Sequence, residues 1–350
     1  MVEKMLTIPY GESNFELIRN KNFLYVDKTH FIRQLERTSK LIHLRPRRFG
    51  KSLFISMLES YYDVASMDKF DALFTGLAIH ENPTNYRNSY YVLRFNFSGI
   101  GTKDIDMILG GFLRRVKNDV NAFIKKYNLN IEIEDDGTPA GVLDSMLTAF
   151  HGLNLEHKVY ILIDEYDHFT NAVLNEGLEG FMTLVTRGGM VRSFYEIIKF
   201  KSELGIVERF FMTGVMSVSL DSMTSGFNIA TNISTDERFS DMMGFTSDEV
   251  KTLLATPRFI NSKSKDIALT ESEQEEAYEI WKQNYNGYLF STKSKIKVFN
   301  STLIMYYLQK YIEEKEHPQS LVDSNLNQSG KMIRGLVEVK NSEVNHRVVE

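Results

Sequence analysis

Two short motifs in this chain contain the residue types that bind phosphate groups and a divalent metal ion. The first motif, HLRPRRFGKSLF over residues 43–54, has Gly50, Lys51 and Ser52 in the order found in phosphate-binding loops. In such a loop the backbone N–H groups and the lysine contact the phosphates, and the hydroxyl group that follows the lysine binds Mg²⁺. The usual pattern, G-x-x-x-x-G-K-[ST], has glycine where this chain has Arg45, so this motif alone is a weak signal.

Three arginines stand in front of the glycine of this motif, at Arg45, Arg47 and Arg48. A guanidinium group binds phosphate through a planar pair of hydrogen bonds, so these side chains can compensate for a loop that is poor in glycine. They can equally form a surface for a partner or a solvated surface, and Pro46 restricts the loop by fixing one φ angle. The residues that we predict to bind the nucleotide are Arg45, Arg48, Gly50, Lys51, Ser52 and Leu53.

The second motif, VYILIDEYD, places two acids directly after an apolar run. The run from residue 159 to 163 is typical of a strand that is covered on both faces. In ATPases with a phosphate-binding loop the first acid holds the metal ion, usually through water, and the second polarises the attacking water. We therefore predict Asp164 and Ser52 as metal ligands and Glu165 as a catalytic residue.

A third polar side chain, Thr213, follows the apolar part of IVERFFMTGV, residues 206–215. We predict a catalytic role for Thr213, in contact with the terminal phosphate or with the attacking water. A buried hydroxyl group that is bonded to the backbone is an equally good interpretation of this residue.

The elements that must position these residues alternate between strands and helices from residue 41 to 215. Apolar runs predict strands at 40–44, 90–99, 159–163 and 206–215, with helical patterns between them. This alternation predicts an α/β fold with three layers, in which a parallel sheet has helices on its faces. Ligands of such sheets bind at the carboxyl ends of the strands, where both motifs and Thr213 are found.

The character of the sequence changes after residue 216, where a segment rich in Ser, Thr, Asn and Asp begins. We expect an N-terminal segment, residues 1–40, that packs on a P-loop core at residues 41–244. Residues 245–350 are expected to form a smaller, mostly helical domain. The final residues, NSEVNHRVVE, contain no helix stop signal, so the sequence leaves room for further residues after Glu350 in the full protein.

The composition is that of an ordinary globular protein, with 43% hydrophobic and 25% charged residues. The net charge of −5 provides no general attraction to nucleic acid or to anionic membranes. The chain has no cysteine, which excludes disulfides, thiolate metal sites and a cysteine nucleophile. The sequence contains neither a signal peptide nor an apolar run of about 18 residues, so we expect no membrane span and a cytoplasmic location.

Taken together, the motifs resemble the bacterial AAA-ATPase-like family of P-loop proteins. The likeness covers nearly the whole chain and rests on IPYGESNFELIRNKNFLYVDKTHFI, LRPRRFGKSLFISML, VYILIDEYD, FFMTGVMSVSLDSMTSGFNIATNIS, and YNGYLF followed by VFNSTLIMYYL. The loop RPRRFGKS, with arginine at the position of the first glycine, looks like this family's own form. Each piece is common, but the combination is specific.

The resemblance implies ATP and Mg²⁺ as ligands and a sheet of the ASCE type, which has an additional strand. It also implies that Lys51 and Ser52 bind the phosphates and Mg²⁺, that Asp164 and Glu165 form the second motif, and that Thr213 occupies the sensor position. Members of the family often carry a PD-(D/E)xK nuclease-like domain after the ATPase, which would lie beyond residue 350 here. The preference for adenine over guanine rests on this resemblance alone.

We expect an ATPase that hydrolyses ATP with Mg²⁺ and couples the nucleotide state to an attached or partner effector. The alternatives are a nucleotide-sensing switch with little or no hydrolysis and a nuclease-associated regulatory ATPase. The sequence does not choose among the possible arginine fingers, Arg187, Arg192 and Arg209. Asp323 with the triplet from residue 338 to 340 matches the acid and E-x-K spacing of nucleases, but too few residues remain for that fold.

Overall fold

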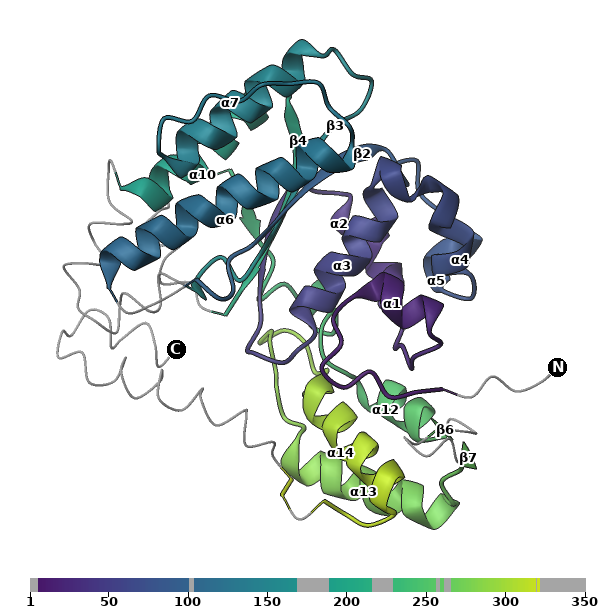
Figure 1. The fold of residues 1–350 in the computed structure, drawn as a ribbon. Helices are drawn as coiled ribbons and strands as arrows, with labels where there is room; N and C mark the ends of the chain where they lie inside the picture. Colours follow the sequence, from purple (N-terminus) through teal and green to yellow (C-terminus); the bar gives the residue numbers. More distant parts are fainter. Residues whose placement is uncertain are drawn as a thin grey trace. The chain divides into compact units, whose positions relative to one another are not determined.

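The computed structural model describes residues 6–100, 104–168, 189–215, 229–255, 259–260, 266–318 and 320–321 (Figure 1). The chain has an α/β fold with five parallel strands, β1 to β5, and flanking helices, as the sequence predicts. Its residues divide between two compact units. The described residues of the first unit fall within 1–90 and 231–322, and those of the second within 91–230.

The first unit contains the phosphate-binding loop. Strand β1 (Lys40–Leu44) pairs in parallel with β5 (Thr231–Asn232), and the loop that follows β1 leads into α3 (Lys51–Tyr62). Most of the residues of α3 are buried, which is expected of a helix that is surrounded by other elements of its unit. The other helices of five to fourteen residues are α1 (Phe15–Asn20), α4 (Phe70–Phe74), α12 (Ser247–Leu254), α13 (Glu271–Asn284) and α14 (Ser301–Glu314).

Shorter elements complete the first unit. They are α2 (Ile32–Leu35), α5 (Ala78–Glu81), the 3-10 helices η1 (Thr29–Phe31), η2 (Val64–Lys69) and η3 (Glu237–Phe239), and the antiparallel pair β6 (Phe259–Ile260) and β7 (Asp266–Ile267). Thr246 and Glu249 form a capping box at the start of α12.

The second unit is built on three strands and three long helices. Strand β3 (Lys158–Asp164) lies between β2 (Tyr90–Asn96) and β4 (Val207–Gly214), and its residues after Lys158 are buried. Helix α7 (Pro139–Gly152) contacts both α6 (Ile105–Lys126) and α10 (Met190–Glu203) (Figure 1). The apolar run that predicts a central strand is therefore the middle strand of this unit.

The register of β3 and β4 determines which side chains meet at their carboxyl ends. The two strands are parallel, and Ile163 is paired with Met212. The residues that follow, Asp164 and Thr213, consequently lie beside each other at the same edge. The end of β2 reaches this edge as well, because the N–H group of Phe97 donates to the carbonyl oxygen of Asp164 at 3.1 Å.

Two further expectations from the sequence concern regions that are described in part. Within the described residues, no helix is long and apolar enough to cross a membrane. The polar segment after residue 216 lies outside the described residues up to residue 228, as do Arg187, Asp323 and the triplet at 338–340. The domain boundaries at residues 40 and 244 remain predictions.

Candidate functional site

The predicted site residues divide between the two units, and each half is described by itself. The phosphate-binding loop belongs to the first unit, where β1 leads to it and α3 follows it. The acidic pair and Thr213 belong to the second unit, at the carboxyl ends of β3 and β4.

The backbone of the loop contains two residues in the left-handed region, Arg48 with φ 72° and Gly50 with φ 85°. Glycine adopts this conformation without steric cost, which explains why Gly50 stands directly before α3. Arg48 has a Cβ atom and needs support from its surroundings to remain there. Its carbonyl oxygen accepts a hydrogen bond from the N–H group of Thr302 at 3.3 Å, which provides such support.

The amino terminus of α3 is open to an anion. Gly50 occupies the N-cap position of this helix and provides no capping side chain. The N–H groups of a helix's first turn have no partner inside the helix, so they and the helix dipole favour a negatively charged ligand. Lys51, Ser52 and Leu53 are the first three residues of the helix.

The side chain of Lys51 is folded back over its own loop. Its Nζ atom donates to the carbonyl oxygens of Arg45 and Pro46, each at 3.0 Å. The side chain is only 6% exposed, so the ammonium group is held at the loop. Burial lowers the pKa of the nearby His43 well below its usual range, and the charges of Arg45 and Lys51 lower it further.

The three arginines of the loop have different environments. Arg45 is 1% exposed, whereas Arg47 is half-buried and Arg48 is exposed. The guanidinium group of Arg45 donates to the carbonyl oxygens of Leu44 (2.8 Å), Ser234 (2.7 Å) and Phe239 (2.9 Å).

The same guanidinium group of Arg45 lies 4.0 Å from the ring centre of Phe290. A buried cation requires such contacts because it has lost its hydration. Burial lowers the pKa of Arg45 to about 9, and Asp241 opposes part of this shift. These contacts join the loop to two distant segments, and phosphate binding by Arg45 remains a prediction.

In the second unit, Asp164 is fully buried and only partly hydrogen-bonded. Its Oδ1 atom accepts from the hydroxyl group of Thr213 at 3.0 Å, while Oδ2 has no hydrogen-bond partner within the part of the chain that the structure describes. An unbonded buried carboxylate oxygen is costly unless a ligand, an ion or a water molecule satisfies it. Mg²⁺ takes oxygen ligands, keeps several water molecules and needs only one or two carboxylates beside the phosphates. Asp164 therefore fits the role of metal holder.

Glu165 differs from Asp164 in both backbone and exposure. It has φ 53°, a left-handed conformation that is uncommon for a residue other than glycine. Its side chain is 33% exposed, and its Oε2 atom lies 3.5 Å from Nδ1 of His168. Because strained residues are concentrated at functional sites, this conformation supports a functional assignment for Glu165.

Close packing joins the turn after β3 to the end of β4. Two residues of this contact, Asp167 and Gly214, are not predicted from the sequence. The N–H group of Tyr166 donates to the carbonyl oxygen of Thr213 at 3.1 Å, and Oδ2 of Asp167 accepts from the N–H group of Val215 at 3.0 Å. A Cβ atom on Gly214 would lie 2.3 Å from Cε1 of Tyr166. Two local sequence signals could have indicated these residues: the Thr-Gly pair at the end of β4 for Gly214, and the last aspartate of DEYD for Asp167.

The remaining arginine candidates are only partly accounted for. Arg192 forms an ion pair with Glu196 at 2.9 Å, and Arg209 is 5% exposed on β4. Arg187 lies outside the described residues. Neither described arginine is thereby identified as an arginine finger.

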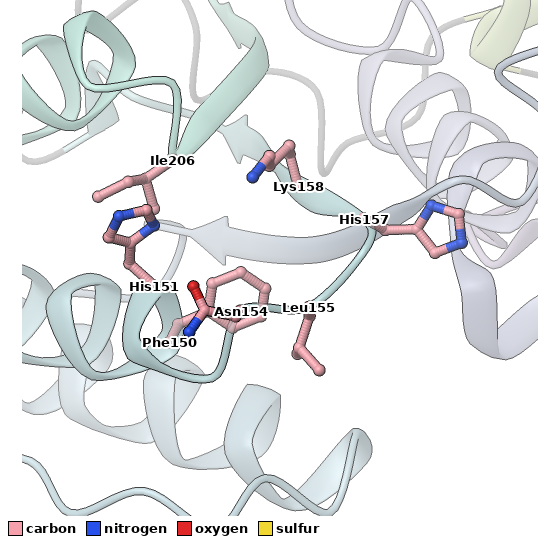
Figure 2. Close-up of a pocket in the computed structure, with 7 residues that line it drawn as sticks. All are labelled: Phe150, His151, Asn154, Leu155, His157, Lys158 and Ile206. Carbon is pink, nitrogen blue, oxygen red and sulfur yellow. The ribbon is translucent and has the colours of Figure 1, made fainter.

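A pocket of about 120 Å³ lies at the opposite end of the central strand from Asp164 (Figure 2). It is lined by Phe150, His151, Asn154, Leu155, His157, Lys158 and Ile206. Lys158 begins β3, and Ile206 directly precedes β4. None of the predicted site residues lines this pocket, and the imidazole ring of His157 points away from the other side chains in Figure 2.

The α/β fold, the loop with Gly50 and Lys51, and the acids at the end of a buried strand define a protein of the P-loop ATPase class. The chain belongs to the predicted AAA-ATPase family, whose sequence model matches residues 9–224. This match confirms the family that the sequence motifs predict. Nucleotide binding follows from the family, while Mg²⁺, hydrolysis and a nuclease-like domain remain predictions.

Two known proteins illustrate how far the similarity extends. An uncharacterized protein in the vnfD 5' region of Azotobacter chroococcum mcd 1 is 30% identical over 251 residues, which are 71% of this chain. This chain therefore spans about 45% of the length of that relative. Among solved structures, a Walker-type ATPase of Pyrococcus abyssi is similar with a TM-score of 0.45 and 12% identity, over 98% of this chain and 79% of that one.

Proposed function

We propose that this protein binds ATP together with Mg²⁺, hydrolyses it, and couples the nucleotide state to an attached or partner effector. The observation that carries this proposal is the fully buried Asp164, which has one oxygen bonded to Thr213 and the other without a partner among the described residues. In a member of the predicted AAA-ATPase family, such a carboxylate is suited to hold a hydrated metal ion.

The phosphates would be bound by the loop of the first unit. The backbone N–H groups at the start of α3, including that of Leu53, would donate to them, and Ser52 would provide its hydroxyl group to Mg²⁺. Lys51 would exchange its bonds to the carbonyl oxygens of Arg45 and Pro46 for phosphate oxygens, which are stronger partners because they are charged. The exposed Arg48 could add a contact to the ligand.

The hydrolytic step would depend on the second unit. Mg²⁺, when bound, would neutralise the charge that develops on the β- and γ-phosphate oxygens. Glu165 would accept a hydrogen bond from the attacking water and orient it, in agreement with its partly exposed side chain. Thr213 would hold the carboxylate of Asp164 in place through the bond at 3.0 Å.

The proposal is tested by measuring ATP binding and Mg²⁺-dependent ATP hydrolysis for the full chain. We expect Lys51→Ala to lose ATP binding, because the loop then lacks its phosphate-binding cation. We expect Glu165→Gln to retain ATP binding while hydrolysis falls by about 100-fold or more, the usual contribution of a general base. The proposal fails if the wild type neither binds nor hydrolyses ATP.

Two surface variants serve as matched controls for these substitutions. Lys69→Ala removes an exposed lysine that pairs with Glu16, and Glu279→Gln neutralises an acid that pairs with Lys282 on the surface of α13. Both should bind and hydrolyse ATP as the wild type does. Loss of activity in these controls as well would show that the assay reports general damage rather than the site.

A second candidate is a switch that senses ATP with little or no hydrolysis. The contacts between the loop and the segment before α14 favour it, because Phe49 packs edge-on against Tyr288 at 4.8 Å and against Phe290 at 5.4 Å. A change in the loop's conformation on ligand binding would therefore alter the packing of that segment. Tight ATP binding without turnover, with altered protease cleavage at residues 285–300, would support this candidate over the ATPase.

A further inference from the structure

One aromatic pair, formed between the N-terminal segment and α14, is not explained by phosphate binding or by catalysis. Tyr10 and Tyr306 are both half-buried, and their ring centres lie 5.6 Å apart with the planes tilted by 55°. They come from opposite ends of the described chain. We propose that these two tyrosines form the platform on which the base of the bound nucleotide stacks, an inference that rests on the proposed function.

Tyr306 is brought toward the loop by the start of α14. The N–H group of Thr302 donates to the carbonyl oxygen of Arg48 at 3.3 Å, and Ser301 Oγ lies 3.9 Å from the position of a Cβ atom on Gly50. Tyr306 follows Thr302 by four residues, about 6 Å along the helix axis. Because side chains on a helix lean toward its amino terminus, the ring of Tyr306 is directed back toward the loop.

Tyr10 is presented by a tight turn. The N–H group of Glu12 donates to the carbonyl oxygen of Pro9 at 3.1 Å, and Gly11 has φ 80°. A glycine with positive φ at the third position is characteristic of a type II turn. Tyr10 thus occupies the second position of an ordered turn, so little conformational freedom would be lost when a ligand stacks on it.

The segment that carries Tyr10 leads to a contact with α3, the helix that begins at the phosphate-binding loop. The N–H group of Phe15 donates to Oγ of Ser56 on α3 at 3.0 Å. Ser56 lies one turn after Ser52 and shares its face of the helix. The segment from Tyr10 to Phe15 therefore contacts α14 at its first residue and α3 at its last.

The chemistry of such a pair matches a nucleobase. With the phosphates at the start of α3, as proposed above, a nucleoside that lies along the first turns of the helix would come close to α14. An aromatic ring face stacks on any base without requiring hydrogen bonds to its edge. The platform would increase affinity for nucleotides over free polyphosphates, while leaving the phosphate contacts unchanged.

The test compares two ligands that are not hydrolysed, ADP and inorganic pyrophosphate, each titrated with Mg²⁺ into the full chain by calorimetry. Tyr10→Ala and Tyr306→Ala should each weaken ADP binding by about 5- to 100-fold, the effect of losing one stacking partner. Pyrophosphate binding should not change. Tyr10→Phe and Tyr306→Phe should bind ADP as the wild type does, because the ring face remains.

The matched control is Tyr86→Ala. Tyr86 is 39% exposed and stacks on Tyr90, with the ring centres 6.1 Å apart. Close by in sequence, Thr84 is hydrogen-bonded to the hydroxyl group of Tyr61, which lies near the carboxyl end of α3 and therefore far from the phosphate-binding loop. The control substitution should not affect ADP binding. If an alanine variant melts at a lower temperature, Tyr306→Leu retains the apolar packing without an aromatic face and should still lose ADP affinity.

The outcomes separate this inference from the proposed function. Wild-type ADP affinity in Tyr10→Ala and Tyr306→Ala, with the wild type binding both ligands, overturns the platform and leaves the P-loop ATPase proposal intact. Equal losses for ADP and pyrophosphate also overturn it, because the tyrosines then support the loop and not the base. A wild type that binds neither ligand overturns both proposals.

Discussion

The hydrogen bond between Thr213 and Asp164 leads to a prediction with a defined magnitude. Thr213→Val retains the shape of the side chain but removes the hydroxyl group that donates to Oδ1 of Asp164 at 3.0 Å. Both residues are 0% exposed, and no described residue bonds to Oδ2 of Asp164. The variant therefore leaves a buried carboxylate with neither oxygen bonded to a described donor.

A hydrogen bond to a charged group contributes about 1.5–3 kcal/mol to stability. We expect Thr213→Val to lower the free energy of unfolding by this amount, measured by urea denaturation with an unchanged m-value. Thr213→Ser retains the hydroxyl group and loses one methyl group, so it should cost only about 1 kcal/mol. Thr75→Val is the control, since that exposed hydroxyl group donates to the carbonyl oxygen of Asp71 at 2.6 Å and its loss should cost less.

A double-mutant cycle decides whether the effect belongs to this pair. In the background of Asp164→Ala, Thr213→Val should cost much less than in the wild type, because the acceptor is already missing. If Thr213→Val unfolds at the same urea concentration as the wild type, the hydrogen bond to Asp164 does not stabilise the fold. An equal cost in both backgrounds would show that the hydroxyl group acts on something other than Asp164.

Two further substitutions test packing and pH dependence. Gly214→Ala should destabilise the protein by about 1–3 kcal/mol, because its Cβ atom would lie 2.3 Å from the buried ring of Tyr166. Gly110→Ala is the control and should not destabilise the protein, because its Cβ atom would meet nothing within 4 Å. Equal melting temperatures for the two variants would contradict the packing argument. At the start of α13, the hydrogen bond from the N–H group of Thr270 lowers the pKa of Glu273 from 4.5 to about 2. A lowered acid pKa stabilises the fold above pH 4.5, and this contribution is lost as the pH falls toward 2. The difference in the free energy of unfolding between the wild type and Glu273→Gln should therefore shrink over that pH range. A difference that does not depend on pH would contradict this prediction.

Much of the fold was predictable because its signals are local. The four predicted strands correspond to β1 to β4, since each is an apolar run bounded by polar residues. The acids at the end of β3 follow from the same argument, because a strand buried on both faces must end where charged residues begin. Strand β5, with two residues, was too short to produce such a pattern.

The environment of the loop arginines could not be predicted in this way. The interior position of Arg45 depends on carbonyl oxygens 189 and 194 residues away in the chain and on the ring of Phe290. A sequence reading sees only that three arginines precede a glycine, and such a cluster fits phosphate, partner or solvent equally well. The left-handed conformation of Arg48 likewise has no signature in the residue itself.

The order of residues along the chain is enough to show which residue types stand at the ends of the strands and therefore which class of chemistry this protein can perform. Lys51 after Gly50, and Asp164 before Glu165, are fixed by the order of residues along the chain. The partner that each side chain meets becomes visible in the folded chain alone: Thr213 for Asp164, three carbonyl oxygens for Arg45, and Tyr306 for Tyr10. The physical reason is that strand register and helix packing bring together residues whose separation in sequence carries no information about their distance in space.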